Sequence, residues 1–152
     1  MNSFINTPIG ILEIKASDEF ITSLNFVQTE IDKFNSEDNN LIKEAKNQLD
    51  AYFNKKLKNF DLPIYLKGTP FREKTWKGLL KIPYGEVISY KQLAASIESP
   101  KAIRAVGGAN NKNPIVIIVP CHRVIGANGK LVGYGGGISK KQFLLNLEGN
   151  TI

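Results

Sequence analysis

Residues 89–109 read SYKQLAASIESPKAIRAVGGA and set the architecture of the second half of the chain. The stretch opens on Ser89 with a glutamine three residues later, a capping-box pattern that predicts a helix over 89–97. Ser99-Pro100 places a cap residue before a proline and predicts another helix over 100–109. Two short helices separated by two or three residues are typical of a helix-turn-helix. On this pattern alone, two core helices joined by a tight turn are an equal alternative.

The second of these helices carries residues suited to a surface contact. Lys101 and Arg104 stand among small side chains, which would let the helix approach a partner closely. These small residues are Ala102, Ala105, Gly107, Gly108 and Ala109.

Charge is divided unevenly along the chain of 152 residues, whose net charge is +6. Residues 1–66 carry 7 basic and 10 acidic side chains, a net charge of −3, whereas residues 67–152 carry 13 and 4, a net charge of +9. This asymmetry favours a polyanion-binding face on the C-terminal part over an ordinary solvated basic surface. The pattern also changes to short helices from residue 69, and we therefore predict two domains, 1–66 and 67–152.

Composition excludes several classes of protein. No stretch approaches the roughly 18 apolar residues of a membrane helix, and the N-terminus lacks a signal-peptide pattern, so we expect a cytoplasmic protein, or a nuclear one in a eukaryote. A single cysteine cannot form an internal disulfide and counts against a dithiol redox role. One cysteine and one histidine are too few for a structural zinc site. We expect a monomer without metal or cofactor.

The N-terminal part reads as a small α+β scaffold. Strands are predicted over Ser3–Ile5 and Ile9–Lys15, on either side of the turn cluster Asn6-Thr7-Pro8. A polar linker, Asn35–Asn40, leads into a helix, and Asp61–Lys67 is predicted as a further strand. Apolar residues mark a third strand and one face of the helix: Ile21, Leu24 and Phe26, then Leu41, Ile42, Ala45, Leu49, Tyr52 and Phe53.

The C-terminal part carries further start and stop signals. Thr69-Pro70 predicts the start of a helix that Pro83-Tyr84-Gly85 ends. Ile115–Val119 is an apolar, strand-like run. A small hairpin or wing is predicted where Val124-Ile125 and Lys130–Val132 flank Asn128-Gly129.

A final helix is predicted to open on a second capping box at Ser139 and Gln142, with Phe143, Leu144 and Leu147 on one face. The fold we expect is α+β: a strand-rich N-terminal domain with one helix, then a mostly helical, winged-helix-like domain that contains the helix-turn-helix.

The only cysteine and the only histidine of the chain are neighbours, Cys121 and His122. A thiol attacks as thiolate, and imidazole is suited to take its proton near neutral pH. A free cysteine is most often a small buried hydrophobe. Three features favour chemistry instead: the strand-like run before it, the adjacent histidine, and glycine-rich stretches such as Gly133–Gly137 that let a ligand approach the backbone.

Consecutive side chains point to opposite faces of an extended chain, so a bridging water is a natural relay between His122 and the sulfur. Glu148 is the candidate for the carboxylate that fixes the imidazole tautomer. The alternative for Glu148 is a solvent-exposed helix end. An acid at a helix C-terminus is mildly disfavoured by the helix dipole, which favours a further role.

Several segments together resemble the O6-alkylguanine-DNA alkyltransferase family. They are residues 71–76, 82–94, 100–110, Asn113-Pro114, 118–124, Gly133-Tyr134, Gly136-Gly137 and Leu144 to Glu148-Gly149. The match covers 69–149 in register, whereas 1–68 fits the variable N-terminal domain of the family only in general shape. The resemblance implies repair of double-stranded DNA that contains O6-alkylguanine, and possible action on O4-alkylthymine. The helix-turn-helix would hold the minor groove, and the flipped base would give its alkyl group irreversibly to Cys121, without a cofactor.

The resemblance also implies roles at matching positions. Cys121 would be the nucleophile and acceptor, with His122 as base through water and Glu148 orienting it. Tyr90 would donate a proton to N3 of guanine, and Asn113 would be the hinge between recognition helix and cysteine segment. The remaining implied contacts are to DNA, by Arg104 (filling the base stack), Tyr90, Ser89, Lys101, Ala102, Ala105, Gly107 and Arg123, and to the base, by Val124, Tyr134 and Gly135.

The reaction requires a thiolate. An unperturbed thiol has a pKa of about 8.5, and lowering it by about three units needs roughly 4 kcal/mol of thiolate stabilisation. We expect the relay through His122 and Glu148, with nearby dipoles, to supply it.

Three other functions compete with this interpretation. A non-enzymatic damage-binding relative would replace the cysteine, commonly with tryptophan. A transcription regulator would not explain the cysteine segment. A cysteine hydrolase would need a base that faces the sulfur, which the adjacency of Cys121 and His122 opposes.

Overall fold

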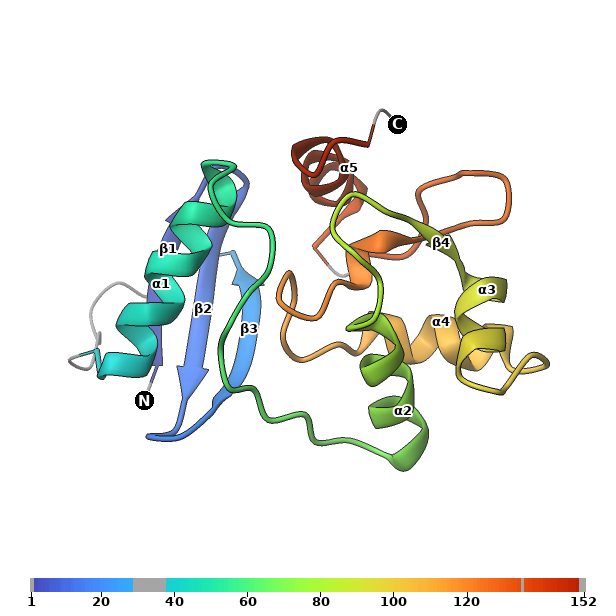
Figure 1. Cartoon of the computed structure of the whole chain (residues 1–152), viewed down its shortest axis with the longest axis horizontal. Coiled ribbons are helices and arrows are strands. Elements are labelled where there is room, and N and C mark those ends of the chain that lie inside the picture. The colour runs from blue at the N-terminus through green and yellow to red at the C-terminus, as the bar shows by residue number, and fades with distance from the viewer. Residues whose placement is uncertain (1, 29–37, 135, 151–152) are drawn as a thin grey trace. The chain divides into compact units, whose positions relative to one another are not determined.

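The structure is a computed structural model that describes residues 2–28, 38–134 and 136–150. It divides into two compact units, residues 1–65 and 66–152 (Figure 1). The first unit is a small sheet with one helix, and the second is mostly helical, which confirms the predicted α+β class. None of the helices in these described ranges is both long and apolar enough to cross a bilayer.

The first unit contains an antiparallel sheet of β1 (Asn2–Thr7), β2 (Gly10–Ala16) and β3 (Ile21–Val27), in that order. Thr7 pairs with Gly10, so the connecting turn is Pro8-Ile9, which overlaps the predicted cluster at Pro8 and extends one residue beyond it. Buried residues alternate along β2, at Leu12, Ile14 and Ala16. With Ile21 and Leu24 of β3 they form the apolar core of the sheet.

Helix α1 (Asn40–Phe53) lies across one face of this sheet (Figure 1). Asn39 is its N-cap, with the side-chain oxygen 2.8 Å from the Ile42 amide nitrogen. The predicted apolar stripe is largely confirmed, because Ile42, Ala45, Leu49 and Tyr52 are buried. Part of the predicted linker, residues 35–37, lies outside the described residues, and its last residue is already helical.

The strand predicted over Asp61–Lys67 is wrong. Only one isolated bridge forms there, between Ile64 and Ile21. The Ile21 amide donates to the Pro63 carbonyl over 2.8 Å, and the Tyr65 amide donates to the Ile21 carbonyl over 2.9 Å. Pro63 has no N–H with which to extend the ladder.

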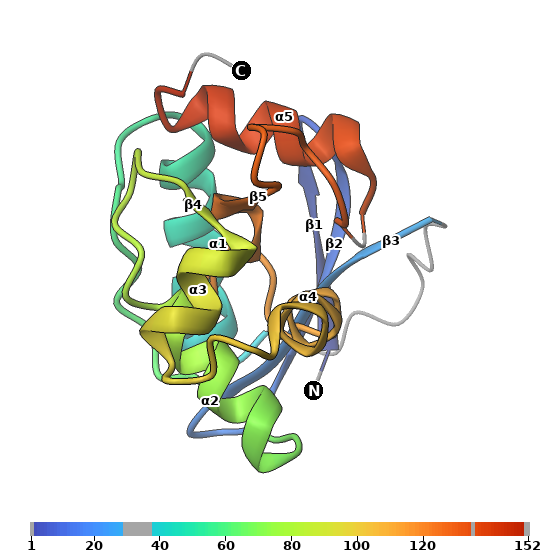
Figure 2. The ribbon, with the colours of Figure 1, turned by 90° about the vertical axis from the view of Figure 1, so that its right-hand side faces the viewer.

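Three helices form the centre of the second unit: α2 (Pro70–Leu79), α3 (Tyr90–Ser96) and α4 (Ile103–Asn111), which pack against one another (Figure 2). Thr69 caps α2, which ends ahead of the predicted stop at Pro83-Tyr84-Gly85. The capping box predicted at Ser89 is present in both directions. The indole nitrogen of Trp76 donates to the Ala109 carbonyl over 2.8 Å and ties α2 to α4.

The predicted start of the second helix of the pair is wrong by three residues. Helix α4 begins at Ile103 without a side-chain cap. The Ser99 carbonyl instead accepts the Ala102 amide over 2.9 Å and closes a turn across Pro100. The connection therefore covers 97–102, and the helix ends at Asn111, two residues beyond the predicted end at 109.

The predicted wing is not a hairpin ladder. Strand β5 (Val124–Ile125) pairs in parallel with β4 (Ile88–Ser89) instead. No strand forms over 130–132 in the described segment. Two backbone hydrogen bonds close the loop, from the Gly126 amide to the Lys130 carbonyl at 2.8 Å and from the Gly129 amide to the Gly126 carbonyl at 3.0 Å.

Helix α5 (Ile138–Leu147) also begins differently from the prediction. Its N-cap is Gly137, whose φ of 102° suits glycine, and Ser139 already lies in the first turn. The helix buries Lys141, Leu144 and Leu145, whereas Phe143 and Leu147 of the predicted face are half-buried. Glu148 follows as the C-cap and is buried.

Candidate active site

A compact loop, rather than the predicted strand, leads to the cysteine. In residues 115–119 the ladder consists of one isolated bridge, between Val116 and Val119, and Ile117 has a φ of 71°. The buried amide of Asn113 holds this loop: its oxygen accepts the Ile115 amide over 3.0 Å, and its nitrogen donates to the Val119 carbonyl over 2.8 Å. Asn113 thus fixes the path of the backbone into Cys121.

Cys121 opens a single 3₁₀ turn, η1 (Cys121–Arg123), in which all three residues are buried. Its amide donates to the Val119 carbonyl over 2.8 Å, and its carbonyl accepts from the Asn110 side-chain nitrogen over 3.3 Å. The extended geometry expected for Cys121 and His122 is wrong, but within the described residues no hydrogen bond joins the sulfur to the imidazole. A relay between them needs an intervening group.

His122 and Glu148 meet as the sequence predicted. Imidazole Nε2 lies 2.7 Å from Glu148 Oε2, and both side chains are fully buried. The carboxylate also accepts two hydrogen bonds from Arg123, from Nε over 2.8 Å and from Nη2 over 3.0 Å. A bidentate contact of this kind fixes the plane of the carboxylate and therefore that of the imidazole.

The proton inventory of this pair follows from its surroundings. Burial alone would raise the pKa of Glu148, but the hydrogen bonds from His122 and Arg123 and the positive charge of Arg123 lower it to about 2. Burial, together with the charges of Arg123 and Lys141, lowers the pKa of His122 against the opposing effect of Glu148, so the ring is neutral at pH 7. An ionised carboxylate only accepts, so Nε2 carries the ring proton. Nδ1, which is buried without a partner, keeps a free lone pair.

Arg123 is placed differently from its predicted DNA-contacting role. The side chain is 8% exposed, and Nη1 donates to the Ile82 carbonyl over 2.7 Å in addition to the two contacts to Glu148. Its guanidinium carbon also lies 5.7 Å from the centre of the Tyr84 ring. Every nitrogen of the guanidinium is thus engaged inside the unit. Glu148 is the only buried carboxylate among the described residues, and Arg123 is the cation that balances its charge.

The thiol itself is protonated in this structure. Burial raises the pKa of Cys121 to about 11, against the opposing effects of a hydrogen bond from Asn113 and the charge of Lys141. This is the reverse of the lowered pKa that we expected from the sequence. Desolvation of the thiolate outweighs the stabilising groups present.

Tyr90 lies beside the cysteine segment. Its hydroxyl donates to the Val132 carbonyl over 3.0 Å, and burial raises its pKa, with the Cys121 charge contributing in the same direction. Gly133 has a φ of 63°, and a Cβ there would lie 3.2 Å from the Tyr90 hydroxyl. Only glycine therefore fits at this position without moving Tyr90.

Three buried polar atoms of this region have no hydrogen-bond partner: His122 Nδ1, Asn110 Oδ1 and the Tyr134 hydroxyl. All three belong to residues linked to Cys121 by sequence, by a hydrogen bond, or by charge. Unsatisfied buried groups of this kind mark a place for a polar ligand or water. Gly135, which was predicted to contact the base beside Tyr134, lies outside the described residues. Within the described residues, no group of three His, Cys, Asp or Glu side chains could hold a metal ion.

The predicted DNA-contacting residues of the recognition helix differ in exposure. Lys101, Arg104 and Ala105 are exposed, and Arg104 makes no hydrogen bond or ion pair to the described residues. Ser89, Ala102 and Gly107 are half-buried: the first caps α3, the second is the N-cap of α4, and a Cβ on the third would lie 3.9 Å from the Tyr90 ring.

Lys141 is a site residue that the sequence analysis missed. It is fully buried, and its ammonium group donates to the backbone carbonyls of Val124 and Val132. Its position three and four residues before Leu144 and Leu145 places it on the inner face of α5. That spacing was the available signal, but lysines are almost always exposed.

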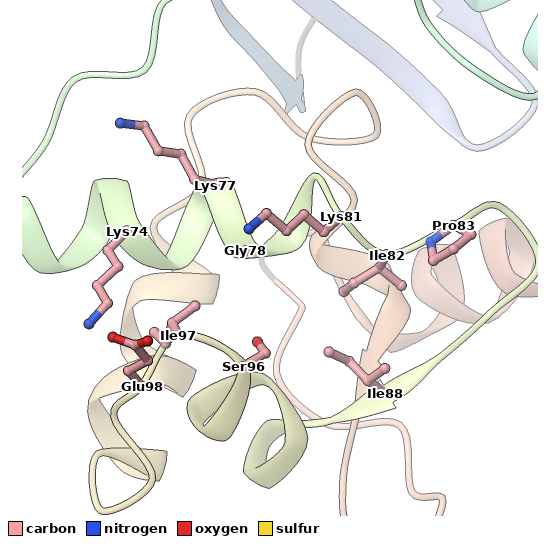
Figure 3. Close-up of a pocket in the computed structure, with 10 residues that line it drawn as sticks. All are labelled: Lys74, Lys77, Gly78, Lys81, Ile82, Pro83, Ile88, Ser96, Ile97 and Glu98. Atoms are coloured by element: carbon pink, nitrogen blue, oxygen red, sulfur yellow. The ribbon is translucent and has the colours of Figure 1, made fainter.

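A separate groove of about 470 Å³ lies between α2 and the C-terminal end of α3 (Figure 3). Lys74 and Lys77 of α2 and Lys81, two residues after its end, lie beside it, and isoleucines 82, 88 and 97 supply apolar lining. None of the predicted site residues lines this groove, so it is distinct from the cysteine site.

Comparison with known proteins matches both parts of the chain to one family. Residues 1–66 match the model described as "6-O-methylguanine DNA methyltransferase, ribonuclease-like domain", and residues 70–150 match the corresponding "DNA binding domain". The resemblance inferred from the sequence is thereby confirmed.

Individual relatives agree. A methylated-DNA–protein-cysteine methyltransferase of Methanosarcina barkeri is 47% identical over 152 residues, covering 97% of this chain and 96% of that protein. One from Mycobacterium tuberculosis is 48% identical, covering 95% and 89%. Among solved structures, M. tuberculosis OGT in complex with DNA superimposes with a TM-score of 0.87 at 48% identity, covering 95% of this chain and 90% of that one.

Proposed function

Because the chain belongs to the 6-O-methylguanine DNA methyltransferase family, we propose that it is a methylated-DNA–protein-cysteine methyltransferase, which repairs DNA by direct reversal. It moves an alkyl group from O6 of guanine to Cys121. The observation that carries the assignment of residues is the relay at the thiol. The only cysteine of the chain is buried beside an imidazole that Glu148 orients, with the second ring nitrogen free to accept a proton.

Binding begins on the exposed face of α4. Arg104 is solvent-exposed and has no partner among the described residues, so its side chain is available to enter the base stack when the damaged guanine leaves it. Flipping a base costs a few kcal/mol, and less for a poorly paired lesion. Lys101 contacts phosphate, and residues 67–152 carry a net charge of +9 that attracts the DNA backbone. These interactions offset the cost of flipping and make binding salt-dependent.

Transfer is a displacement at the alkyl carbon. The thiol proton passes, through a water, to His122 Nδ1, and the imidazolium is stabilised by Glu148. The Cys121 thiolate forms the new C–S bond as the bond between carbon and O6 breaks, and its electron pair stays on the base. Tyr90 gives its hydroxyl proton to N3, so that guanine departs neutral. The imidazolium proton of His122 then passes through solvent to the Tyr90 oxygen, which leaves both side chains neutral.

The Tyr90 hydroxyl is in the protonated state that a proton donor requires. Burial raises its pKa above the ordinary value, so the hydroxyl keeps its proton at neutral pH. The product, S-alkylcysteine, is a thioether, and the sequence contains no second thiol to displace the alkyl group. Each molecule therefore acts once.

Mass spectrometry of the intact protein tests the proposal. The protein is mixed with duplex DNA that contains one O6-methylguanine, with unmodified duplex and the Cys121→Ser variant as controls. The expected result is a gain of one methylene unit, mapped to the Cys121 peptide and saturating at one per molecule. Tight lesion-selective binding without mass gain would instead identify a damage-binding protein.

A further inference from the structure

Lys141 is the one fully buried lysine among the described residues, and the reaction outlined above does not use it. Its ammonium group donates to the Val132 carbonyl over 2.8 Å and to the Val124 carbonyl. The first of these carbonyls also accepts the Tyr90 hydroxyl, and the second follows directly after η1. One cation thus joins the cysteine turn, the loop that follows it, and Tyr90.

The charge of Lys141 has no carboxylate partner in the described part of the chain. Glu148, the nearby buried acid, is engaged by His122 and Arg123. A buried ammonium without an anion is costly, and burial accordingly lowers the pKa of Lys141 to about 8. A thiolate at Cys121 raises the pKa of Lys141, and the charge of Lys141 lowers that of Cys121.

We propose that Lys141 is a positioning residue whose ammonium group is the counter-charge of the Cys121 thiolate during alkyl transfer. The thiol proton goes to His122, and the anion left on sulfur then has a cation held rigidly by two carbonyls. The other charged or titratable groups that interact with Lys141 are the Tyr90 ring, 5.8 Å from Nζ, and the His122 imidazole, whose protonation its charge opposes. The inference deepens the proposed function and rests on it.

Three substitutions separate charge from hydrogen bonding. Lys141→Arg keeps the charge and the donors, Lys141→Gln keeps donors without charge, and Lys141→Met removes both. Lys77→Gln, at an exposed position of α2, is the matched control. Circular dichroism and thermal unfolding verify each fold, and the glutamine variant decides the matter if the methionine variant does not fold.

The readout is the rate at which iodoacetamide alkylates the protein between pH 6 and 10. Because the chain has one cysteine, this rate reports the thiolate of Cys121 alone. Below pH 8 we expect Lys141→Gln and Lys141→Met to react about tenfold more slowly than wild type, and Lys141→Arg within threefold of it. Above pH 8 the profiles of wild type and the glutamine variant should converge, because Lys141 itself loses its proton.

A glutamine variant that reacts as fast as wild type across the range would overturn the proposal and leave Lys141 as a hydrogen-bond donor only. So would an arginine variant as slow as the methionine variant. Failure of the proposed function gives a different signature: wild-type protein then gains no methyl group from O6-methylguanine DNA, whatever the iodoacetamide profiles show.

Discussion

Arg123→Met is the substitution that best separates the site seen in the structure from the site expected from sequence. The variant removes two hydrogen bonds to Glu148, at 2.8 and 3.0 Å, and one to the Ile82 carbonyl, at 2.7 Å. It leaves a buried carboxylate without the cation beside it, hydrogen-bonded to the neutral His122 imidazole. Removing one member of a buried ion pair costs about 3–5 kcal/mol. The free energy of unfolding of a small domain is about 5–15 kcal/mol in total, so this loss would leave the second unit marginally stable.

Urea unfolding at pH 7 measures this loss, with Glu148→Gln and the double variant completing a cycle. We expect the double variant to be less destabilised than the sum of the two single variants, because Glu148→Gln removes the stranded charge. DNA affinity is measured in parallel at several salt concentrations. A guanidinium that touched phosphate would contribute about one unit to the slope of log affinity against log salt. We expect this slope to stay unchanged.

The opposite pattern would refute the reasoning. If Arg123→Met unfolded at the same urea concentration as wild type while its salt slope fell by about one, Arg123 would be a DNA contact. The hydrogen bonds to Glu148 would then contribute nothing to stability. Arg123→Lys is an internal check, since it keeps the charge without the bidentate geometry. Its free energy of unfolding should lie between those of wild type and Arg123→Met.

The remaining predictions concern DNA, the leaving group and acid. Arg104→Ala should weaken repair in duplex DNA more than reaction with free O6-benzylguanine, and equal loss on both substrates would remove its stack-filling role. Tyr90→Phe should slow transfer at saturating DNA, measured by single-turnover quench; an unchanged rate argues against proton donation. Glu148, with its pKa lowered from 4.5 to about 2, should add about 3 kcal/mol of stability above pH 4.5 that is lost as pH falls towards 2. Urea unfolding from pH 6 to 2 should show this loss in wild type, and Glu148→Gln should lack that component.

Local signals predicted elements where tertiary structure did not compete with them. Thr69 and Ser89 cap their helices as expected: the Thr69 side chain accepts the Arg72 amide, and Ser89 forms a capping box with Gln92. Ser99 and Ser139 carry the same chemistry, yet neither caps a helix. A turn closed by the Ser99 carbonyl occupies the first position, and the left-handed Gly137 starts α5 before the second. Cap patterns give candidates, and the neighbouring backbone decides among them.

Cys121, His122 and Glu148 could be named from sequence as candidates, because their types and order suit nucleophilic chemistry, and the structure brings His122 and Glu148 together. Arg123 was assigned to DNA and Lys141 was overlooked for one reason: the sequence shows charge but not burial. Lys141 is buried because carbonyls 17 and 9 residues away converge on its ammonium group, a relation that no local pattern contains. The raised pKa of Cys121 has the same origin, in burial created by the whole unit.

That raised pKa bears on how a protein that acts once protects its thiol. At pH 7 only a very small fraction of a thiol with a pKa of about 11 is ionised, so electrophiles in solution react with it slowly. Reaction then needs a base in the pocket, which DNA binding supplies, beside groups already in place in the free protein: His122 as proton acceptor and, on our proposal, Lys141 as the counter-charge. Selectivity for damaged DNA thus begins with the burial of the nucleophile, before any contact to the lesion.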